Sequence, residues 1–349
     1  IKPEELRWDW VEHFLGGAGL ATRYLYDELP RDADPLGAGN PLIFMTGPLT
    51  GTASASASRY SVVAKSPQTG IWGQANSGGT FGPELKRSGY DGIIFTGISS
   101  CPVYLQIING TAELRAAQPL WGKTAPETEE LIQEAAPRKV TIASIGPGGE
   151  NLVRFAAIMN NGHRAAGRCG LGAVMGSKKL KAIACAGDQP IRLADESAFR
   201  EIARHQVELV NESILKVGFD AFGTNMLSDM VNVRGGYPTM NWQQGEFDQI
   251  EEVNAQALTD KVFVDGVNCF ACPIICGRGT EIKTGQWRGN KGEGPEYETT
   301  NTFGAMCGVE DMEAITMAYY RCNEYGLDTI STGSTIAFAM ECYQRGALS

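Results

Sequence analysis

Three cysteines within eight residues constrain this chain more than any other feature of its sequence. Cys269, Cys272 and Cys276 are separated by two and then three residues, a spacing that aligns the thiols along one side of a tight loop leading into a helical turn. A cysteine-rich run with a proline beside a ligand is typical of iron–sulfur proteins. Such a cluster and zinc both need four protein ligands, so a fourth has to come from a distant position or from a partner. The alternatives are a zinc site and a buried loop of unliganded cysteines.

The composition excludes several classes of protein. The 349 residues, 43% of them hydrophobic, suffice for two domains, and the odd number of nine cysteines favours a reducing compartment, hence the cytoplasm. A net charge of −10 gives no basic field for nucleic acid or for an anionic membrane, and no apolar run approaches the roughly 20 residues of a membrane span. The first ten residues contain no apolar signal core and begin without Met, so we expect the sequence to start inside a longer gene product.

Three glycine-rich loops follow one another before residue 173, at 76–79, 145–151 and 163–172. A glycine turn that leads onto a helix N-terminus presents free N–H groups to a phosphate, and the third loop adds Arg164 and Arg168. None of the loops has the GxGxxG or GxxxxGK[ST] pattern of a nucleotide site. Their number favours a large, multiply phosphorylated cofactor, but a glycine-rich β-fold with tight corners explains the same pattern.

The composition changes between Gln189 and Ala194, where the glycine loops give way to helical periodicity that begins after the N-cap residue Asp195. We therefore place a domain boundary there, which gives domains of residues 1–190 and 191–349. Strands are predicted in the first domain at 41–46, 59–65, 92–96, 103–108, 139–144 and 181–186. Helices are predicted at 16–29, 81–87, 125–135, 173–177, 196–216, 225–233, 311–325 and 334–344.

A series of segments resembles, in the same order, the tungsten-dependent aldehyde:ferredoxin oxidoreductase family. Besides the three cysteines, these segments are Thr46–Gly51, Arg59–Tyr60, Ala75–Gly79, Ser144–Gly146, Gly149–Asn151, His163–Ser177, Glu293–Glu298 and Gly326–Thr332. The resemblance covers the chain from about Leu15 to Gly346. It implies an α+β fold, in which an N-terminal saddle of β-sheets with helices is followed by a mainly α-helical domain that is truncated here. It also implies a tungsten or molybdenum ion held by two pterins beside one [4Fe–4S] cluster.

The resemblance assigns cofactor-binding roles to particular residues. Arg59 resembles the arginine between cluster and pterin, where its fork of donors can reach both. The backbone oxygens of Asn76 and Ala166 resemble the ligands of a Mg²⁺ ion that bridges the pterin phosphates, a hard cation that prefers oxygen. Cys269, Cys272 and Cys276 resemble three of the cluster ligands. The remaining cofactor-binding residues lie in loops that resemble the family's pterin-holding loops: Gly78, Gly79, Arg164, Arg168, Asn323 and Asp328.

The resemblance also implies a reaction. Glu298 and Tyr297 resemble acid–base groups next to the metal, where a carboxylate can manage the proton released as an aldehyde hydrate is oxidised. An aldehyde and water would give a carboxylic acid, with electrons passing through the cluster to a ferredoxin-like acceptor, and the cofactor would supply the redox chemistry. Two alternatives stay open. One is a dearomatising aryl-CoA reductase of the same family, and the other is a non-catalytic iron–sulfur electron-transfer subunit.

The sequence departs from the family in three places. Asn323 replaces the Asp that begins the pterin-holding turn, which keeps an acceptor oxygen but loses a charge. Met317 and Tyr320 stand where some members carry a Glu and a His for a metal at the subunit interface, so that site is not expected. The sequence ends at Ser349, whereas the family continues through a domain with the fourth cluster cysteine. We therefore expect an inactive fragment that forms a homodimer or associates with the missing C-terminal part.

Overall fold

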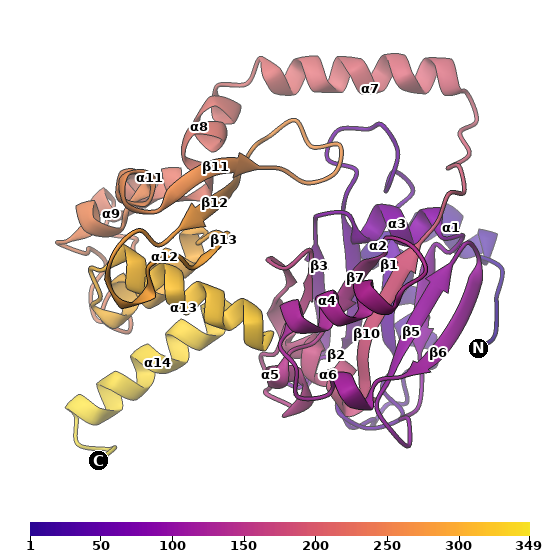
Figure 1. Cartoon of the computed structure of the whole chain (residues 1–349), viewed down its shortest axis with the longest axis horizontal. Coiled ribbons are helices and arrows are strands. Elements are labelled where there is room, and N and C mark those ends of the chain that lie inside the picture. Colours follow the sequence, from indigo (N-terminus) through magenta and orange to yellow (C-terminus); the bar gives the residue numbers. More distant parts are fainter. The chain divides into compact units, whose positions relative to one another are not determined.

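Two β-sheets formed by residues before Gln206 face each other across one hydrophobic core (Figure 1). The computed structural model describes residues 1–349, and its chain divides into two compact units that are described separately. Unit 1 comprises Ile1–Gln206 together with two later segments, Cys269–Cys272 and Asn323–Asp328. Unit 2 comprises Val207–Asn268, Pro273–Cys322 and Thr329–Ser349.

Both sheets of unit 1 are largely antiparallel. The four-stranded sheet has the order β3 (Trp72–Ser77), β2 (Tyr60–Lys65), β1 (Leu42–Thr46), β4 (Gly92–Phe95). The six-stranded sheet has the order β6 (Thr111–Ala116), β5 (Val103–Ile108), β10 (Leu180–Ala186), β7 (Thr141–Ser144), β8 (Ile158–Asn160), β9 (Arg164–Ala166). Within the six-stranded sheet only β5 and β10 pair in parallel, which is possible because a long crossover connection separates them.

Successive residues of a strand point to opposite faces, so alternate side chains in unit 1 lie either in the core between the two sheets or on the outer side of a sheet. In β1, Leu42 and Phe44 belong to the core shared by the two sheets, whereas Ile43 and Met45 pack on the outer side. Strand β10 follows the same rule, with Ile183 in the shared core and its alanines on the outer side. Full burial of one such large apolar side chain contributes about 1.5–3 kcal/mol, so this alternation fixes the register of the strands.

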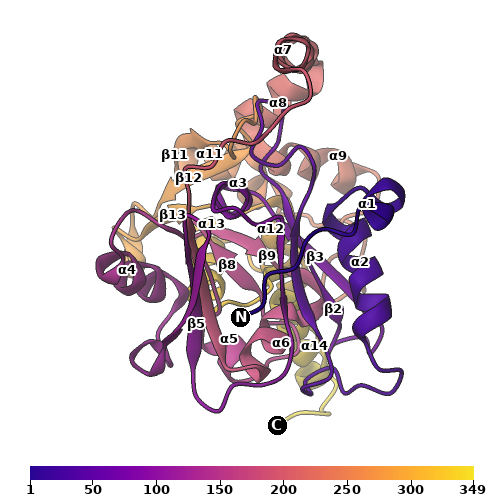
Figure 2. The same ribbon diagram turned by 90° about the vertical axis from the view of Figure 1, so that its right-hand side faces the viewer.

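Helices cover the outer face of each sheet. Helix α2 (Gly17–Glu28), preceded by α1 (Trp8–Phe14), packs on the four-stranded sheet, and α4 (Ala125–Ala135) packs on the six-stranded sheet. Figure 2 shows α2 and α4 on opposite sides of unit 1. Two shorter helices, α3 (Phe81–Arg87) and α6 (Leu171–Ser177), contribute buried residues to the core between the sheets. The short α5 (Pro147–Glu150) follows β7.

Unit 2 is mainly helical but contains a small sheet. Its antiparallel strands have the order β11 (Phe263–Val267), β12 (Gly277–Glu281), β13 (Lys291–Glu293). Its helices are α8 (Ile214–Phe222), α9 (Ser228–Val233), α10 (Ile250–Val253), α11 (Ala255–Lys261), α12 (Tyr297–Phe303), α13 (Met312–Tyr325) and α14 (Thr329–Gln344). Ile282 forms one core with Met317, Tyr319 and Tyr320 of α13. Met306, Cys307 and Ala337 form another.

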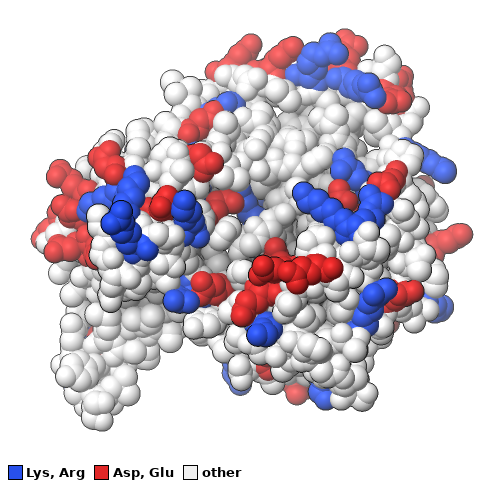
Figure 3. Space-filling model, viewed as in Figure 1, with Lys and Arg blue, Asp and Glu red and all other residues white.

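Helix α7 (Glu196–Asn211) begins in unit 1 and ends in unit 2. Acidic and basic side chains lie beside one another along it (Figure 3), and Arg200 donates to Glu196 one turn earlier. Only Ala203 is buried among its residues, and most of the others are exposed. None of the helices combines the length and the apolar character that a membrane-spanning helix needs.

The predicted α+β class is confirmed, whereas two local predictions are wrong. The helix predicted at 196–216 ends at Asn211, because Ser213 has an extended backbone and α8 begins after it. The cysteine loop was predicted to lead into a helical turn, yet Cys276 is followed by strand β12 of a three-stranded sheet within the mainly helical part. Strand β3 and the edge strand β6 were also not predicted. The domain boundary at residue 190 stays a prediction.

Candidate functional site

The first half of the cysteine loop, Cys269–Cys272, lies in unit 1 against the turn between β3 and α3. The N–H of Phe270 donates to the carbonyl of Gly79 at 3.3 Å, and the N–H of Ser56 donates to the carbonyl of Ala271 at 2.8 Å. These two backbone contacts hold the loop between the 76–79 turn and the segment before β2. The cysteine loop and the first glycine loop, which are almost 200 residues apart in the sequence, therefore form one local structure.

Two sulfur contacts define the position of the cysteines in this structure. A Cβ atom on Gly78 would lie 2.6 Å from the Cys269 sulfur, so only glycine allows this approach without a shift. The Cys272 sulfur lies 3.4 Å from the Ser56 hydroxyl, which is hydrogen-bonding distance for sulfur. Gly79 has a φ of +82°, the left-handed conformation that favours glycine. Both glycines of the predicted phosphate turn thus help to seat the cysteine loop.

A buried amide fixes the conformation of the glycine turn. Asn160, at the end of β8, is fully buried, and its Oδ1 accepts hydrogen bonds from the Tyr60 hydroxyl (3.0 Å) and the Ser77 hydroxyl (2.8 Å). Its Nδ2 donates to the carbonyl of Gly78 at 3.0 Å and to Oδ1 of Asn161 at 2.9 Å. Burial raises the pKa of Tyr60, which keeps the phenol a neutral donor. The sequence reasoning missed Asn160, because a lone Asn before a turn carries no specific signal.

Two predicted cofactor residues meet beside the cysteine loop. Nη1 of Arg59 donates to Oδ1 of Asn76 at 2.5 Å, and both side chains are exposed. Asn76 belongs to β3, where it pairs in register with Ser61 of β2, so the strand pairing sets its position next to Arg59. The structure therefore presents a guanidinium fork and an amide at the edge of the turn that holds Cys269.

The β8–β9 hairpin brings the other predicted residues of unit 1 together. Arg164 and Ala166 lie in β9, opposite Asn160 and Ile158 of β8. Nη1 of Arg168 donates to the buried Asp328 at 3.0 Å, within the segment 323–328 that belongs to unit 1.

The segment 323–328 is tied into unit 1 by its backbone. The N–H of Asp328 donates to the carbonyl of Phe155 at 3.1 Å, and the carbonyl of Gly326 accepts from the N–H of Ala157 at 2.8 Å. Nδ2 of Asn323 is buried and has no hydrogen-bond partner in the structure. A buried amide donor of this kind is costly unless a ligand or water satisfies it.

Burial shifts the pKa values of two ionisable side chains at the loop 161–163. Burial, followed by the charge of Arg164, lowers the pKa of His163 and favours the neutral imidazole. Beneath the loop, Glu129 of α4 accepts the N–H of Gly162 at 3.1 Å. Burial raises the pKa of Glu129 to about 7, and that hydrogen bond opposes the shift.

The predicted acid–base pair lies in unit 2, at the start of α12. Glu298 is exposed, and Tyr297 packs its ring against Tyr237 with the centroids 5.8 Å apart. The N–H of Tyr297 donates to the hydroxyl of Thr224, which donates in turn to Glu296 at 2.5 Å. Burial and then the charge of Glu298 raise the pKa of Tyr297, so the phenol stays protonated near neutral pH. The sequence reasoning did not single out Tyr237.

Cys276, the third predicted cluster ligand, lies in unit 2 just before β12. The structure gathers no three His, Cys, Asp or Glu side chains into a group that could hold a metal ion. The site of three cysteines stays a prediction. The structure shows that two of them are seated by one surface of unit 1, and it places the third in the segment that contains Arg278.

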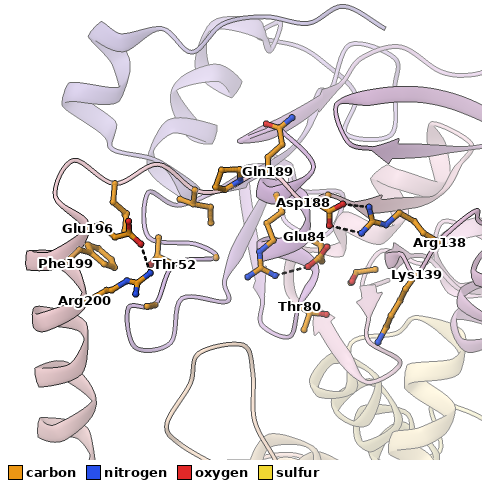
Figure 4. Close-up of a pocket in the computed structure, with 18 residues that line it drawn as sticks. Thr52, Thr80, Glu84, Arg138, Lys139, Asp188, Gln189, Glu196, Phe199 and Arg200 are labelled. Atoms are coloured by element: carbon orange, nitrogen blue, oxygen red, sulfur yellow. Dashed lines mark hydrogen bonds and ion pairs between the residues drawn. The ribbon is translucent and has the colours of Figure 1, made fainter.

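Unit 1 also contains a cavity of about 700 Å³ that none of the predicted residues lines. Figure 4 shows that its charged side chains are mostly paired with one another. Arg138 makes a two-pronged ion pair with Asp188, and Arg87 and Arg200 pair with Glu84 and Glu196. Because these arginines already have carboxylate partners, the cavity offers little charge to a further ligand.

Comparison with known proteins shows two matches that together cover most of the chain. Residues 1–187 match the family described as aldehyde ferredoxin oxidoreductase, N-terminal domain. Residues 201–349 match the family described as aldehyde ferredoxin oxidoreductase, domains 2 & 3.

Individual relatives agree with these matches. The chain is 48% identical, over its whole length, to a tungsten-containing aldehyde ferredoxin oxidoreductase of Thermococcus kodakarensis, of which it covers 57%. It is 47% identical over 99% of its length to the enzyme of the same name from Pyrococcus furiosus, again covering 57%. Among solved structures, the active site complex BamBC of benzoyl coenzyme A reductase in complex with 1,5 dienoyl-CoA superposes with a TM-score of 0.83 at 29% identity. That match covers 99% of this chain and 54% of the solved one. The chain therefore spans little more than half the length of the relatives it matches.

Proposed function

The chain belongs to the aldehyde ferredoxin oxidoreductase family, and on that premise we propose that the complete protein oxidises aldehydes to carboxylic acids and passes the electrons to a ferredoxin-like acceptor. The observation that carries the proposal is the identity of 48% along the entire chain to a tungsten-containing aldehyde ferredoxin oxidoreductase. The cofactors would be a tungsten or molybdenum bis-pterin, a [4Fe–4S] cluster and a Mg²⁺ ion bridging the pterin phosphates. When bound, they would supply the two-electron chemistry and the one-electron transfer.

We propose that the loop around Cys269 holds an iron–sulfur cluster, and the way unit 1 seats this loop supports the proposal. The space that a Cβ of Gly78 would fill is taken by the Cys269 sulfur, and backbone bonds hold the loop on either side of it. Cys269, Cys272 and Cys276 would be three of the ligands, and cluster ligation by cysteine thiolates is the usual arrangement. We propose that Arg59 hydrogen-bonds cluster and pterin.

The pterin-holding role is supported by the turn at 323–328. The buried Nδ2 of Asn323 lacks a protein partner, and a pterin offers ring and phosphate acceptors of the kind that would satisfy it. Asp328 lies in the same turn, next to Arg168. The backbone oxygens of Asn76 and Ala166 would hold the Mg²⁺ ion. The other residues proposed to contact the pterins are Gly78, Gly79 and Arg164.

Two side chains of unit 2 would move or hold protons. Oxidation of an aldehyde hydrate to a carboxylic acid releases two electrons and two protons. The exposed carboxylate of Glu298 would accept one proton, which is the role that a positioned carboxylate plays in general acid–base catalysis. Tyr297, whose pKa is raised by burial, would remain a donor that orients an oxygen of the substrate.

The experiment uses the complete protein, purified without oxygen. We expect tungsten or molybdenum, pterin and four irons per chain, together with reduction of a viologen dye by aldehydes. Zinc without tungsten or molybdenum would refute the proposal.

The variant Glu298→Gln should retain the metals and lose about 10²–10⁴-fold in kcat, the range for a general acid or base. The control Glu310→Gln replaces another exposed glutamate of unit 2 and should keep full activity.

A dearomatising aryl-CoA reductase is the second candidate, because a benzoyl coenzyme A reductase complex superposes over 99% of the chain. Its identity of 29% is well below the 48% shared with the aldehyde enzyme. Comparing turnover of benzoyl-CoA with turnover of a panel of aldehydes distinguishes the two activities.

A further inference from the structure

Arg278, two residues after Cys276, carries the largest fully buried side chain of the molecule, with 2% of its surface exposed. Its guanidinium donates to four main-chain carbonyls and to no carboxylate. Nε donates to Gly277 (3.0 Å) and Nη1 to Ala221 (2.9 Å). Nη2 donates to Asp220 (2.9 Å) and also to Ile275.

These acceptors form two groups. The carbonyls of Asp220 and Ala221 lie in the last turn of α8, where backbone carbonyls lack helical partners and the helix dipole is negative. The carbonyls of Ile275 and Gly277 flank Cys276 on both sides. One guanidinium therefore ties the backbone around Cys276 to the end of a helix, using neutral dipoles to compensate a buried charge.

Two further contacts hold the same segment. The carboxylate of Asp220 accepts the N–H of Ile275 at 2.7 Å and also pairs with Lys216. Gly223 follows α8 with a φ of +61°, and a Cβ there would lie 2.7 Å from the carbonyl oxygen of Cys276. The end of α8 thus contacts Ile275 and Cys276 directly, and Arg278 links it to the carbonyls of Ile275 and Gly277.

The charge of Arg278 is not neutralised by a hydrogen-bonded anion. Because the guanidinium donates to the carbonyls on both sides of Cys276, its charge lies close to that residue. In a buried setting of low dielectric constant, a fixed positive charge at this range acts more strongly than it would in water.

We propose that Arg278 is a positioning residue for Cys276 and supplies a fixed positive charge that raises the reduction potential of the iron–sulfur cluster. This inference rests on the proposed function, because it requires Cys276 to be a cluster ligand. Reduction adds one electron, and hence one negative charge, to the cluster, so a nearby buried cation stabilises the reduced state. Net charge and hydrogen bonding around a cluster are among the main determinants of its potential.

Two substitutions separate position from charge. Arg278→Gln removes the charge and most of the donors, whereas Arg278→Lys keeps the charge but lacks the planar fork that reaches four carbonyls. The complete holoenzyme is titrated anaerobically while the reduced cluster is followed by electron paramagnetic resonance. Iron loss to a chelator is measured on the same samples.

We expect the Gln variant to show a more negative midpoint potential and faster iron loss than the parent protein. The Lys variant should keep a potential close to that of the parent and still lose iron faster. The control Lys291→Gln removes an exposed, Glu281-paired charge from β13 and should change neither quantity.

The outcomes distinguish this inference from the proposed function. A parent protein without four irons and a cluster signal would refute the proposed function itself. A parent protein with a normal cluster, combined with a Gln variant of unchanged potential and iron retention, would overturn only the role of Arg278. If the Gln variant does not fold, the Lys variant decides, because iron retention equal to that of the parent would exclude the positioning role.

Discussion

Gly78 and Cys269 approach each other so closely that a methyl group on Gly78 would lie 2.6 Å from the Cys269 sulfur. Gly78 does not have a positive φ, so the contact, and not the backbone conformation, requires glycine at this position.

Gly78→Ala should therefore reduce the iron content of the complete protein without unfolding it. The methyl group displaces the sulfur or the loop that carries it, and cluster ligation depends on sulfur geometry. Iron and sulfide per chain are measured after anaerobic purification. The matched control is Gly39→Ala, an exposed glycine whose added Cβ would meet only ordinary contacts of 3.6 Å or more. Equal iron content in both variants would contradict the prediction.

Asn160→Ala should destabilise unit 1. It leaves the Tyr60 hydroxyl, the Ser77 hydroxyl and the Gly78 carbonyl without their buried partner. An unsatisfied buried group costs about 1–3 kcal/mol, so we expect the free energy of unfolding to fall by at least that amount. Denaturant titration followed by circular dichroism measures it. Asn211→Ala, at an exposed helix end, should change stability by no more than about 0.5 kcal/mol. A loss for Asn160→Ala as small as that of the control would count against the role of Asn160.

Glu129 makes the stability of unit 1 depend on pH. Its pKa is about 7 in the folded protein instead of 4.5, mainly because of burial. The folded state therefore holds a proton that the unfolded state releases, and stability falls as pH rises from about 4.5 to about 7. Glu129→Gln removes this dependence. The variant should match the parent protein near pH 4.5 and be more stable by about 1–3 kcal/mol at pH 8.

The test of Glu129 is the difference between variant and parent protein in denaturant titrations at the two pH values. The control Glu130→Gln changes an exposed carboxylate one residue further along α4 and should give no pH-dependent difference. A constant difference between Glu129→Gln and the parent protein at both pH values would show that Glu129 titrates normally.

Lys181 and Glu150 form a buried ion pair, with an Nζ–Oε1 distance of 2.5 Å and side chains 0% and 4% exposed. Nζ of Lys181 also donates to the carbonyl of Lys123, and the N–H of Gly122 donates to Glu150. Glu150→Leu leaves an uncompensated ammonium and should lower the free energy of unfolding by about 3–5 kcal/mol.

The double variant Lys181→Met, Glu150→Leu removes both charges of this pair and should recover most of that loss, since well-packed apolar residues often replace buried ion pairs at little cost. Denaturant titration of the single and double variants gives the coupling energy between the two sites. A double variant as unstable as Glu150→Leu alone would show that packing, and not the unpaired charge, causes the loss.

The sequence predicted the fold where local signals were strong. Runs of largely apolar residues identified β1, β2, β5 and β10, because each of these strands buries at least one face. Strand β3 reads Trp-Gly-Gln-Ala-Asn-Ser, without an apolar pattern, and it forms because β2 offers a pairing edge. Strands β11, β12 and β13 contain glycines and charged residues for which local propensity favours a loop.

Several contacts in the candidate site could not be predicted from local sequence patterns either. The contact between Gly78 and Cys269 joins positions almost 200 residues apart, which no local pattern reveals. Arg278 was overlooked because arginine is almost never fully buried unless it is paired, and its compensation by four carbonyls depends on the fold. The family resemblance supplied the residue roles, whereas the contacts between them required the structure.

Unit 1 is assembled from three stretches of sequence, since Cys269–Cys272 and Asn323–Asp328 return to it after long excursions into unit 2. N-terminal domains commonly fold first while the ribosome is still synthesising the chain. Here that order cannot be completed, because the cysteine loop emerges only after Val207–Asn268 of unit 2, and Asp328 only after Pro273–Cys322 as well. During synthesis, the glycine turn of unit 1 therefore stays uncovered until the cysteine loop has been made. A gene divided after residue 206 would encode an N-terminal product that lacks two segments of unit 1.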